Sequence, residues 1–171
     1  RRGASRRARS GRPPRRVYRF VNKHADAKAG AIPQELSPEA RHLQRKLHQT
    51  IKRITNELDG RWHFNTCVSA IMSYVNELYA ADEAIAKGTV PQSLVAELLR
   101  KVVLILAPFA PYLTHELWQR MGDGTELLRH PWPKFDPALA KEDEIEIAVQ
   151  VNGKLRGRVT VAADTPEEQV K

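Results

Sequence analysis

The stretch from Ser37 to Gly60, SPEARHLQRKLHQTIKRITNELDG, decides the fold of this 171-residue chain. Ser37 can cap a helix, Pro38 fits the first helical position, and Glu39 places negative charge at the positive end of the helix dipole. Behind this start, apolar residues recur at spacings of three and four, at Leu43, Leu47, Ile51, Ile54 and Leu58. This spacing puts the side chains on one face, which predicts an amphipathic α-helix that packs against other helices.

The same periodicity recurs on both sides of this stretch. A helix is expected to begin near Val17, another near Phe64, and a last one to end at Gly122. Between them, residues 102–106 are apolar nearly all round, which is typical of a central, buried helix. Short connections favour antiparallel neighbours. The sequence therefore predicts a mainly α fold with an antiparallel helical bundle over residues 17–122.

The pattern changes in the C-terminal part. Residues 123–143 contain three prolines and are expected to form a connector. Apolar and polar residues then alternate on both sides of Asn152-Gly153, which predicts a β-hairpin. Because a lone hairpin is marginally stable in water, residues 144–171 are interpreted as the start of a truncated α+β domain. In a three-residue loop Val149 would lie opposite Leu155 and Ile147 opposite Gly157. The apolar residues of both strands would then share one face, and Lys154, Arg156 and Arg158 would be exposed on the other face.

The basic charge is concentrated at the N-terminus. Residues 1–16 hold eight of the 28 Lys and Arg and no acid, so the other 20 cations balance the 20 Asp and Glu. Residues 1–16 also lack large apolar side chains, which predicts a disordered basic leader. Two interpretations stay open for it: an arm that touches phosphates, or a leader without a role.

Several classes of site and protein are not expected. The single cysteine, Cys67, excludes an internal disulfide framework and a multi-cysteine zinc site, and it fits a reducing, cytoplasmic compartment. The six histidines show no metal-binding spacing, so no metal site is expected. No Gly-rich phosphate loop or nucleophile elbow appears, so no catalytic residue is assigned. No apolar run approaches the roughly 18–20 residues that a membrane span needs.

The aromatic residues offer two interpretations. Exposed aromatic rings could stack on RNA bases. Phe64, Phe109 and Trp118 follow apolar helical faces, so packing in the core is expected for them. Trp62 and Trp132 lie at helix ends or in loops, where both roles stay open.

Two stretches resemble the helical anticodon-binding domain of class I aminoacyl-tRNA synthetases. They are Phe64-Asn65-Thr66-Cys67 and the run from Ala107 to Trp118, APFAPYLTHELW. The Pro-Phe-Ala-Pro…Glu-Leu-Trp pattern of the second stretch is shared by the leucyl, isoleucyl, valyl and methionyl branches. The opening Val17-Tyr18-Arg19-Phe20-Val21, the Phe-Asn-Thr phrase of the first stretch and the phrase His130-Pro131-Trp132-Pro133 resemble the bacterial leucyl branch in particular. The stretch 149–157, VQVNGKLRG, is similar to the start of the small C-terminal domain of that branch.

This resemblance implies the tRNA-binding C-terminal portion of a leucyl-tRNA synthetase, whose whole enzyme attaches leucine to tRNA(Leu) using ATP. The catalytic motifs of the family are absent from this chain, so no cofactor is expected here, while ATP and Mg²⁺ belong to the parent enzyme. The implied partners are tRNA(Leu) and the N-terminal catalytic and editing domains, with the protein acting as a cytoplasmic monomer away from membranes. The candidate tRNA-binding residues are Arg16, Arg19, Lys23, Arg61, Trp62, Lys154, Arg156 and Arg158.

Two positions depart from the family pattern, since Cys67 stands where alanine is usual and His115 where glutamate is frequent. A valyl or isoleucyl fragment is a sister interpretation, against which the Asn152-Gly153-Lys154 turn argues. An interpretation of another class is a stand-alone RNA-binding helical module with a basic N-terminal arm.

Overall fold

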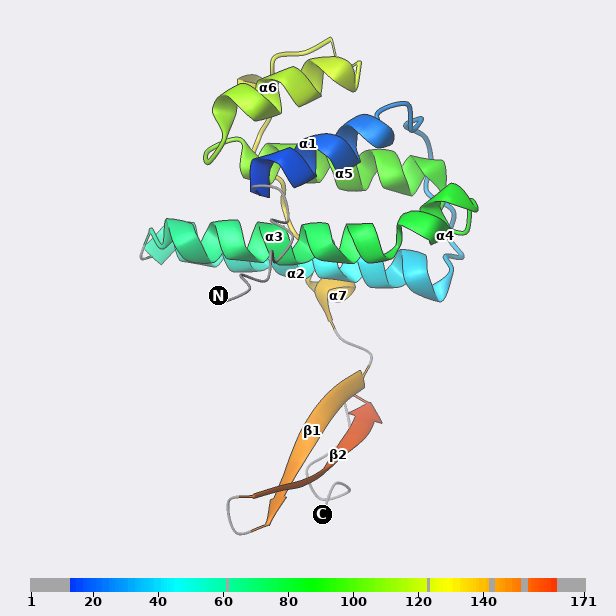
Figure 1. Ribbon diagram of the computed structural model, residues 1–171, viewed down its shortest axis with the longest axis vertical. Helices are drawn as coiled ribbons and strands as arrows, with labels where there is room; N and C mark the ends of the chain where they lie inside the picture. The colour runs from blue at the N-terminus through cyan, green and yellow to red at the C-terminus, as the bar shows by residue number, and fades with distance from the viewer. Residues whose placement is uncertain (1–12, 61, 123, 142–143, 152–153, 163–171) are drawn as a thin grey trace, which may run out of the picture.

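The computed structural model describes residues 13–60, 62–122, 124–141, 144–151 and 154–162 (Figure 1). Its α-helices are α1 Pro13–Lys23, α2 Pro38–Gly60, α3 Phe64–Ala80, α4 Asp82–Ala86, α5 Gln92–Leu106, α6 Pro111–Arg120 and α7 Pro137–Ala140. The described residues also form a 3₁₀-helix, η1 Leu127–Arg129, and two strands, β1 Glu144–Val151 and β2 Lys154–Ala162. The prediction of a mainly α fold is confirmed.

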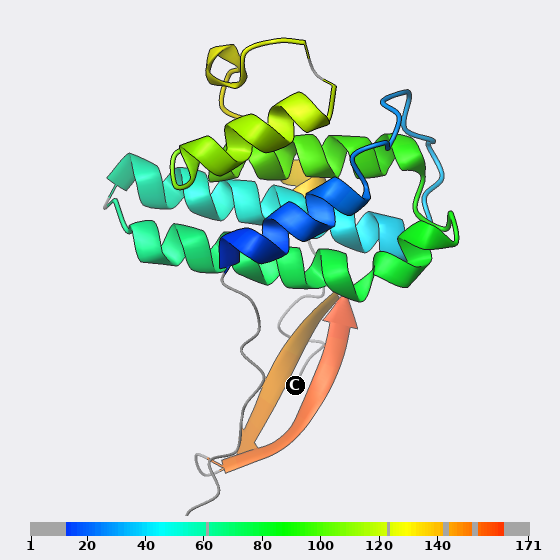
Figure 2. The same cartoon turned by 45° about the horizontal axis from the view of Figure 1, so that its top comes forward.

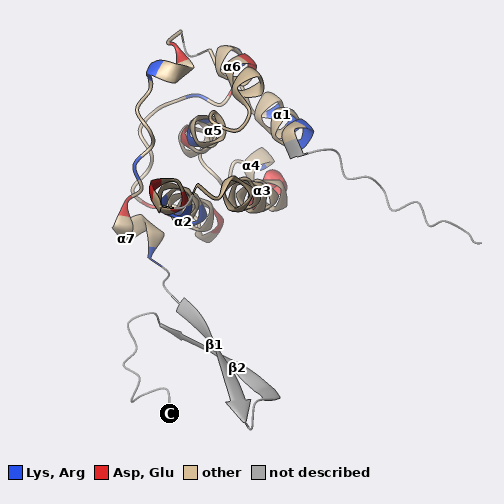
Figure 3. Ribbon diagram, turned by 90° about the vertical axis from the view of Figure 1, so that its left-hand side faces the viewer, with Lys and Arg blue, Asp and Glu red and all other residues tan. Residues whose placement is uncertain are grey.

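The long helices form a bundle around α5. Helices α2 and α3 lie side by side and run in opposite directions, and α1 and α6 lie on the other side of α5 (Figures 1 and 3). In α2 the predicted apolar positions Leu43, Leu47, Ile51 and Ile54 are all buried. In α5 eight apolar side chains between Leu94 and Leu106 are buried, and within residues 102–106 only Leu104 is less than fully buried. The expectation that α5 is the central helix is therefore confirmed.

Helix α1 starts earlier than the sequence suggested. It begins at Pro13, so residues 13–16 are helical rather than part of a disordered leader. Proline is well suited to this place because the first helical turn leaves its N–H groups unpaired in any case. Arg16 also fastens this turn to the bundle: it donates a hydrogen bond to Asn76 Oδ1 at 2.7 Å, and its guanidinium lies 4.9 Å from the Tyr79 ring centroid. Residues 1–12, the rest of the expected leader, lie outside the described residues.

The proline-rich connector packs on the bundle and contains two short helices, η1 and α7, that the sequence did not indicate. Leu127 is buried in the core, and Trp132 Nε1 donates to Thr55 Oγ1 of α2 at 2.9 Å. Farther along, Gln49 Nε2 of α2 donates to the carbonyl oxygen of Ala140 at 3.1 Å. Through these contacts the connector runs from the end of α6 along α2 and packs against it. We call its described residues, 124–141, the strap.

One predicted core residue is not in the core. Phe64 is 47% exposed, because α3 begins at this residue and its ring lies at the end of the bundle. The ring packs edge-on against the partly buried Phe109, with centroids 5.7 Å apart. Trp118, by contrast, is only 1% exposed, which confirms its predicted place in the core.

The two strands pair antiparallel in a register that differs from the expected one. Leu155 lies opposite Gln150, whereas the sequence predicted it opposite Val149. The register shifts between Val149 and Gln150, where β2 advances by one residue more than β1. Beyond this bulge, Ile147 lies opposite Val159. The bulge thus aligns apolar positions of the two strands, as the odd-length loop was expected to do.

Candidate nucleic-acid interface

The exposed side of α2 carries a dense group of positive charges. Between Ala40 and Asn56 this helix has no acidic residue and five cations, namely Arg41, Arg45, Lys46, Lys52 and Arg53. We call these five residues the α2 basic face. Its side chains point away from the buried apolar face of the helix; three of them are exposed and the other two half-buried. In Figure 3 the blue positions of α2 mark this face.

Sequence reasoning missed the α2 basic face because it summed charge over the whole folded body, where the total is zero. The signal is nevertheless present in the sequence. A run of cations without acids over several turns of a helix is the local pattern that indicates a polyanion-binding surface. A count over each predicted helix would have found it.

Two hollows border the α2 basic face, each of about 250 Å³. The first lies between α2 and α7, where Arg41, Arg45 and Lys141 share the wall with the amides of Gln34 and Gln44. No acidic side chain lines this hollow within the described residues.

The second hollow lies between α2 and α3. Lys46 and Arg53 line it together with Thr50 and Ser73, and Glu77 is the one acid on its wall. The Glu77 carboxylate lies 3.1 Å from His42 Nε2, so its charge faces a histidine of α2.

Two of the candidate cations on α1 are used inside the fold. Arg16 is fastened to α3, as described above. Lys23 forms an ion pair of 2.5 Å with Asp82, and His24 Nε2 lies 2.8 Å from the same carboxylate. The hydrogen bond from Lys23 is the main cause that lowers the pKa of Asp82, and the hydrogen bond from His24 adds to it against the opposing effect of burial. Arg19 is exposed on α1.

Trp62 stands at an unusual position between α2 and α3. It is 64% exposed, and its backbone φ of 52° lies in the left-handed region that residues other than glycine rarely adopt. Hydrogen bonds from Trp62 N to the Glu57 oxygen and from Phe64 N to the Trp62 oxygen hold this conformation. The Trp62 and Phe64 rings are 5.9 Å apart, so an exposed aromatic pair ends the bundle here.

The remaining candidates are not placed by the structure. Arg61 lies outside the described residues, as does Gly153, for which the expected three-residue loop predicts a positive φ. For Lys154, Arg156 and Arg158 the structure describes the backbone of β2 and not the side chains.

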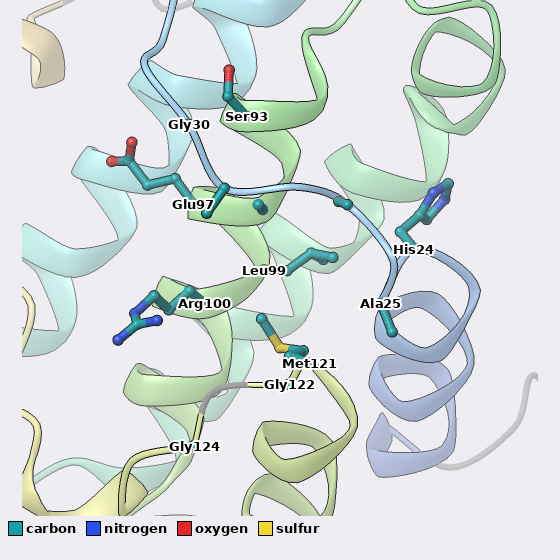
Figure 4. A pocket seen from close by; sticks show the side chains of 13 residues that line it. His24, Ala25, Gly30, Ser93, Glu97, Leu99, Arg100, Met121, Gly122 and Gly124 are labelled. Atoms are coloured by element: carbon teal, nitrogen blue, oxygen red, sulfur yellow. The ribbon is translucent and has the colours of Figure 1, made fainter.

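A larger hollow of about 470 Å³ lies between the end of α1, α5 and the end of α6 (Figure 4). His24, Glu97 and Arg100 are the ionisable residues that line it. Each has a partner in the fold: His24 contacts Asp82, Glu97 pairs with Lys101, and Arg100 lies 4.6 Å from the Trp118 ring centroid. Figure 4 shows Glu97 and Arg100 on the opposite side of the hollow from His24, so they do not converge on one point.

His48 is a buried polar residue that holds the connector. It is 3% exposed, and its Nδ1 accepts a hydrogen bond from the backbone N–H of Asp136 at 2.8 Å. The ring is therefore neutral with its proton on Nε2, which has no partner within the described residues. Burial, followed by the positive charge of Lys101, lowers the pKa of His48, and the carboxylates of Glu97 and Asp136 only partly oppose this.

This environment predicts a loss of stability in acid. Because the folded-state pKa of His48 lies below its ordinary value of 6.5, the unfolded chain binds the proton first as the pH falls. Stability contributed by neutral His48 is complete above pH 6.5 and is lost as the pH falls through the folded-state pKa. Protonation also removes the acceptor for Asp136 N–H, which costs about 1 kcal/mol.

The measurement is urea unfolding between pH 8 and pH 5 for the parent chain and for His48→Gln, whose side-chain oxygen can accept the same hydrogen bond without titrating. We expect the difference in unfolding free energy between the two chains to change in favour of the variant as the pH falls. A constant difference across this range would contradict the assignment, because every other histidine is present in both chains.

Among the helices that the structure describes, none is long and apolar enough to cross a membrane. Within the described residues, no three His, Cys, Asp or Glu side chains come together in a group that could hold a metal ion.

Comparison with known proteins places the chain in a family. A family profile described as "Anticodon-binding domain of tRNA ligase" matches residues 40–171. The leucine–tRNA ligase of Solibacter usitatus is 46% identical over 157 residues, which are 91% of this chain and 18% of that protein. The leucine–tRNA ligase of Syntrophus aciditrophicus is 42% identical over 161 residues, with 91% of this chain and 19% of that protein covered.

A solved structure agrees with these relatives. It is the Agrobacterium radiobacter K84 agnB2 LeuRS in a ternary complex, LeuRS-tRNA-LeuAMS, with a TM-score of 0.77 and 32% identity over 92% of this chain and 20% of that one. The chain thus spans about a fifth of the length of the proteins that it matches. The helical bundle, the strap and the family profile agree, and the chain belongs to the family of anticodon-binding domains of tRNA ligases.

Proposed function

We propose that this chain is the tRNA-binding portion of a leucine–tRNA ligase and that it carries no part of the catalytic site. The observation that carries the proposal is the match, over 92% of the chain, to a LeuRS solved together with tRNA. The sequence similarity to leucine–tRNA ligases from several bacteria supports the leucyl branch over the valyl and isoleucyl branches.

The physical basis of binding is electrostatic. RNA presents one negative charge per nucleotide, and cations that neutralise it release counterions, so that the affinity falls as salt is added. A body of zero net charge can still bind RNA when its cations gather on one surface, and the α2 basic face is such a surface.

The rest of the proposal concerns the whole enzyme. Leucine would be attached to tRNA(Leu) with ATP and Mg²⁺ in catalytic and editing domains that this chain does not include, in a monomeric cytoplasmic protein. The β1–β2 hairpin would begin a small α+β domain. Arg19, Arg61, Trp62 and the β2 cations remain candidate contacts for the tRNA.

The test is the dissociation constant of the chain for tRNA(Leu), measured over a series of salt concentrations. We expect binding at 50 mM salt and a log–log slope of several units, since each phosphate contact contributes about 0.7–0.9. A chain without residues 1–12 serves as the control and should keep most of this dependence. Absence of binding at 50 mM salt would contradict the proposed function, and binding that disappears with residues 1–12 would assign it to the leader alone.

A further inference from the structure

We propose that the α2 basic face is the surface along which the sugar–phosphate backbone of the RNA lies. This inference rests on the proposed function and goes beyond it, because it assigns the contact to one side of one helix.

The five cations are spread along the helix at a spacing that suits a polyanion. At 1.5 Å per residue, Arg41 and Arg53 are separated by about 18 Å along the helix axis, which is long enough to meet several successive phosphates. The helical period of 3.6 residues sorts the cations into two rows. Arg41, Arg45 and Lys52 form one row, in which Arg41 and Arg45 line the hollow beside α7. The Lys52 ammonium in this row lies 6.0 Å from the Phe135 ring centroid. Lys46 and Arg53 form the other row, beside α3.

Neutral donors accompany the row beside α7, where the hollow brings the Gln34 and Gln44 amides to Arg41. Side-chain amides are among the uncharged groups that bond phosphate oxygens beside Arg and Lys. In the hollow beside α3 the Thr50 and Ser73 hydroxyls donate to the carbonyl oxygens of Lys46 and Ser69. The α2 basic face is therefore a surface of cations with amide donors at one edge.

The close spacing of positive charges along α2 is unfavourable for the fold alone. Like charges four residues apart, such as Arg41 and Arg45, repel one another on a helix. On α1 the cations Arg16 and Lys23 each have a partner in the bundle, whereas Arg41 and Arg53 form no ion pair within the described residues. The cost of crowding these cations is offset if a polyanion covers them.

The experiment neutralises each row in the full 171-residue chain. One variant carries Arg41→Gln and Lys52→Gln, a second carries Lys46→Gln and Arg53→Gln, and a matched control carries Lys28→Gln and Lys87→Gln. Each removes two positive charges, and glutamine is nearly as good a helix former as lysine or arginine. Circular dichroism and urea unfolding verify that each variant is folded before its affinity for tRNA(Leu) is measured across the salt series.

We expect each α2 variant to bind tRNA(Leu) about 20- to 60-fold more weakly at 0.1 M salt, with a log–log slope smaller by about 1.4–1.8, as for two lost phosphate contacts. The control should differ from the parent chain by less than about threefold, because it changes only the long-range field. If the α2 variants match the control while the parent chain binds, the α2 assignment is wrong and the proposed function stands. If the parent chain itself does not bind, the proposed function fails.

Two other outcomes would also overturn the inference. An affinity that falls without a change in salt slope would show that these residues do not contact phosphates. A parent chain that binds vesicles of anionic lipid through these residues and ignores tRNA would assign the α2 basic face to a different polyanion.

Discussion

Replacing Trp118 with alanine is expected to lower the free energy of unfolding by about 3–5 kcal/mol, the largest effect of any single substitution considered for this chain. Trp118 lies at the junction of α6, α5 and the strap. Its ring is buried, its Nε1 donates to the Thr125 carbonyl oxygen at 2.9 Å, and the His130 ring packs on it at 4.8 Å between centroids. The Arg100 guanidinium covers the ring from α5.

The alanine variant therefore leaves a cavity and an unpaired carbonyl group at once. Urea unfolding of Trp118→Ala measures the loss, and Trp62→Ala is the matched control, because the exposed Trp62 ring should cost less than about 1 kcal/mol. Equal losses in the two variants would mean that Trp118 is not the packing centre that the structure shows.

Ending the chain at residue 122 is expected to destabilise the bundle by several kcal/mol relative to a chain that ends at residue 141. The shorter chain loses the strap, and with it the buried side chain of Leu127, worth about 1.5–3 kcal/mol, and the hydrogen bond from Trp132 to Thr55, worth about 0.5–1.5 kcal/mol. It also uncovers His48, whose Nδ1 loses the Asp136 N–H. The sum is a large share of the total stability of a domain of this size.

Hydrogen exchange of α2 distinguishes the two outcomes, with residues 13–122 and 13–141 compared under the same conditions. We expect faster exchange in the shorter chain, most strongly between Leu47 and Thr55, where the strap crosses. Equal protection in both chains would show that the strap is a passive connector, as the sequence alone suggested.

The helical core could be predicted from the sequence because its signals are local. The spacing of Leu43, Leu47 and Ile51 fixes the buried face of α2, and the apolar stretch 102–106 identifies the central helix. The strap could not be predicted, since its contacts join residues 77 to 91 positions apart and its prolines are equally typical of a loop. The register of β1 and β2 was predicted wrongly because two arrangements align the apolar residues of the two strands equally well. One is an odd-length loop, and the other is a bulge within the strands.

Local sequence patterns say less about the candidate site than about the fold. Arg16 precedes the helix start expected at Val17 and Lys23 ends α1, but their partners Asn76 and Asp82 lie 60 and 59 positions away, beyond the reach of a local pattern. Charge averaged over the body concealed the α2 basic face. The left-handed conformation of Trp62 belongs to the turn between α2 and α3, and the residue types of this turn do not predict it.

The most direct test of the central claim is a hybrid enzyme. The matching segment of the Solibacter usitatus leucine–tRNA ligase, which is 46% identical over 157 residues, is replaced by the corresponding residues of this chain. ATP–pyrophosphate exchange with leucine then reports on the catalytic domain alone, and leucylation of tRNA(Leu) reports on productive tRNA binding. The account predicts unchanged exchange and a leucylation kcat/KM within about tenfold of the parent ligase, or about 1.4 kcal/mol. A hybrid with normal exchange and no leucylation above that of the ligase lacking this segment would contradict it.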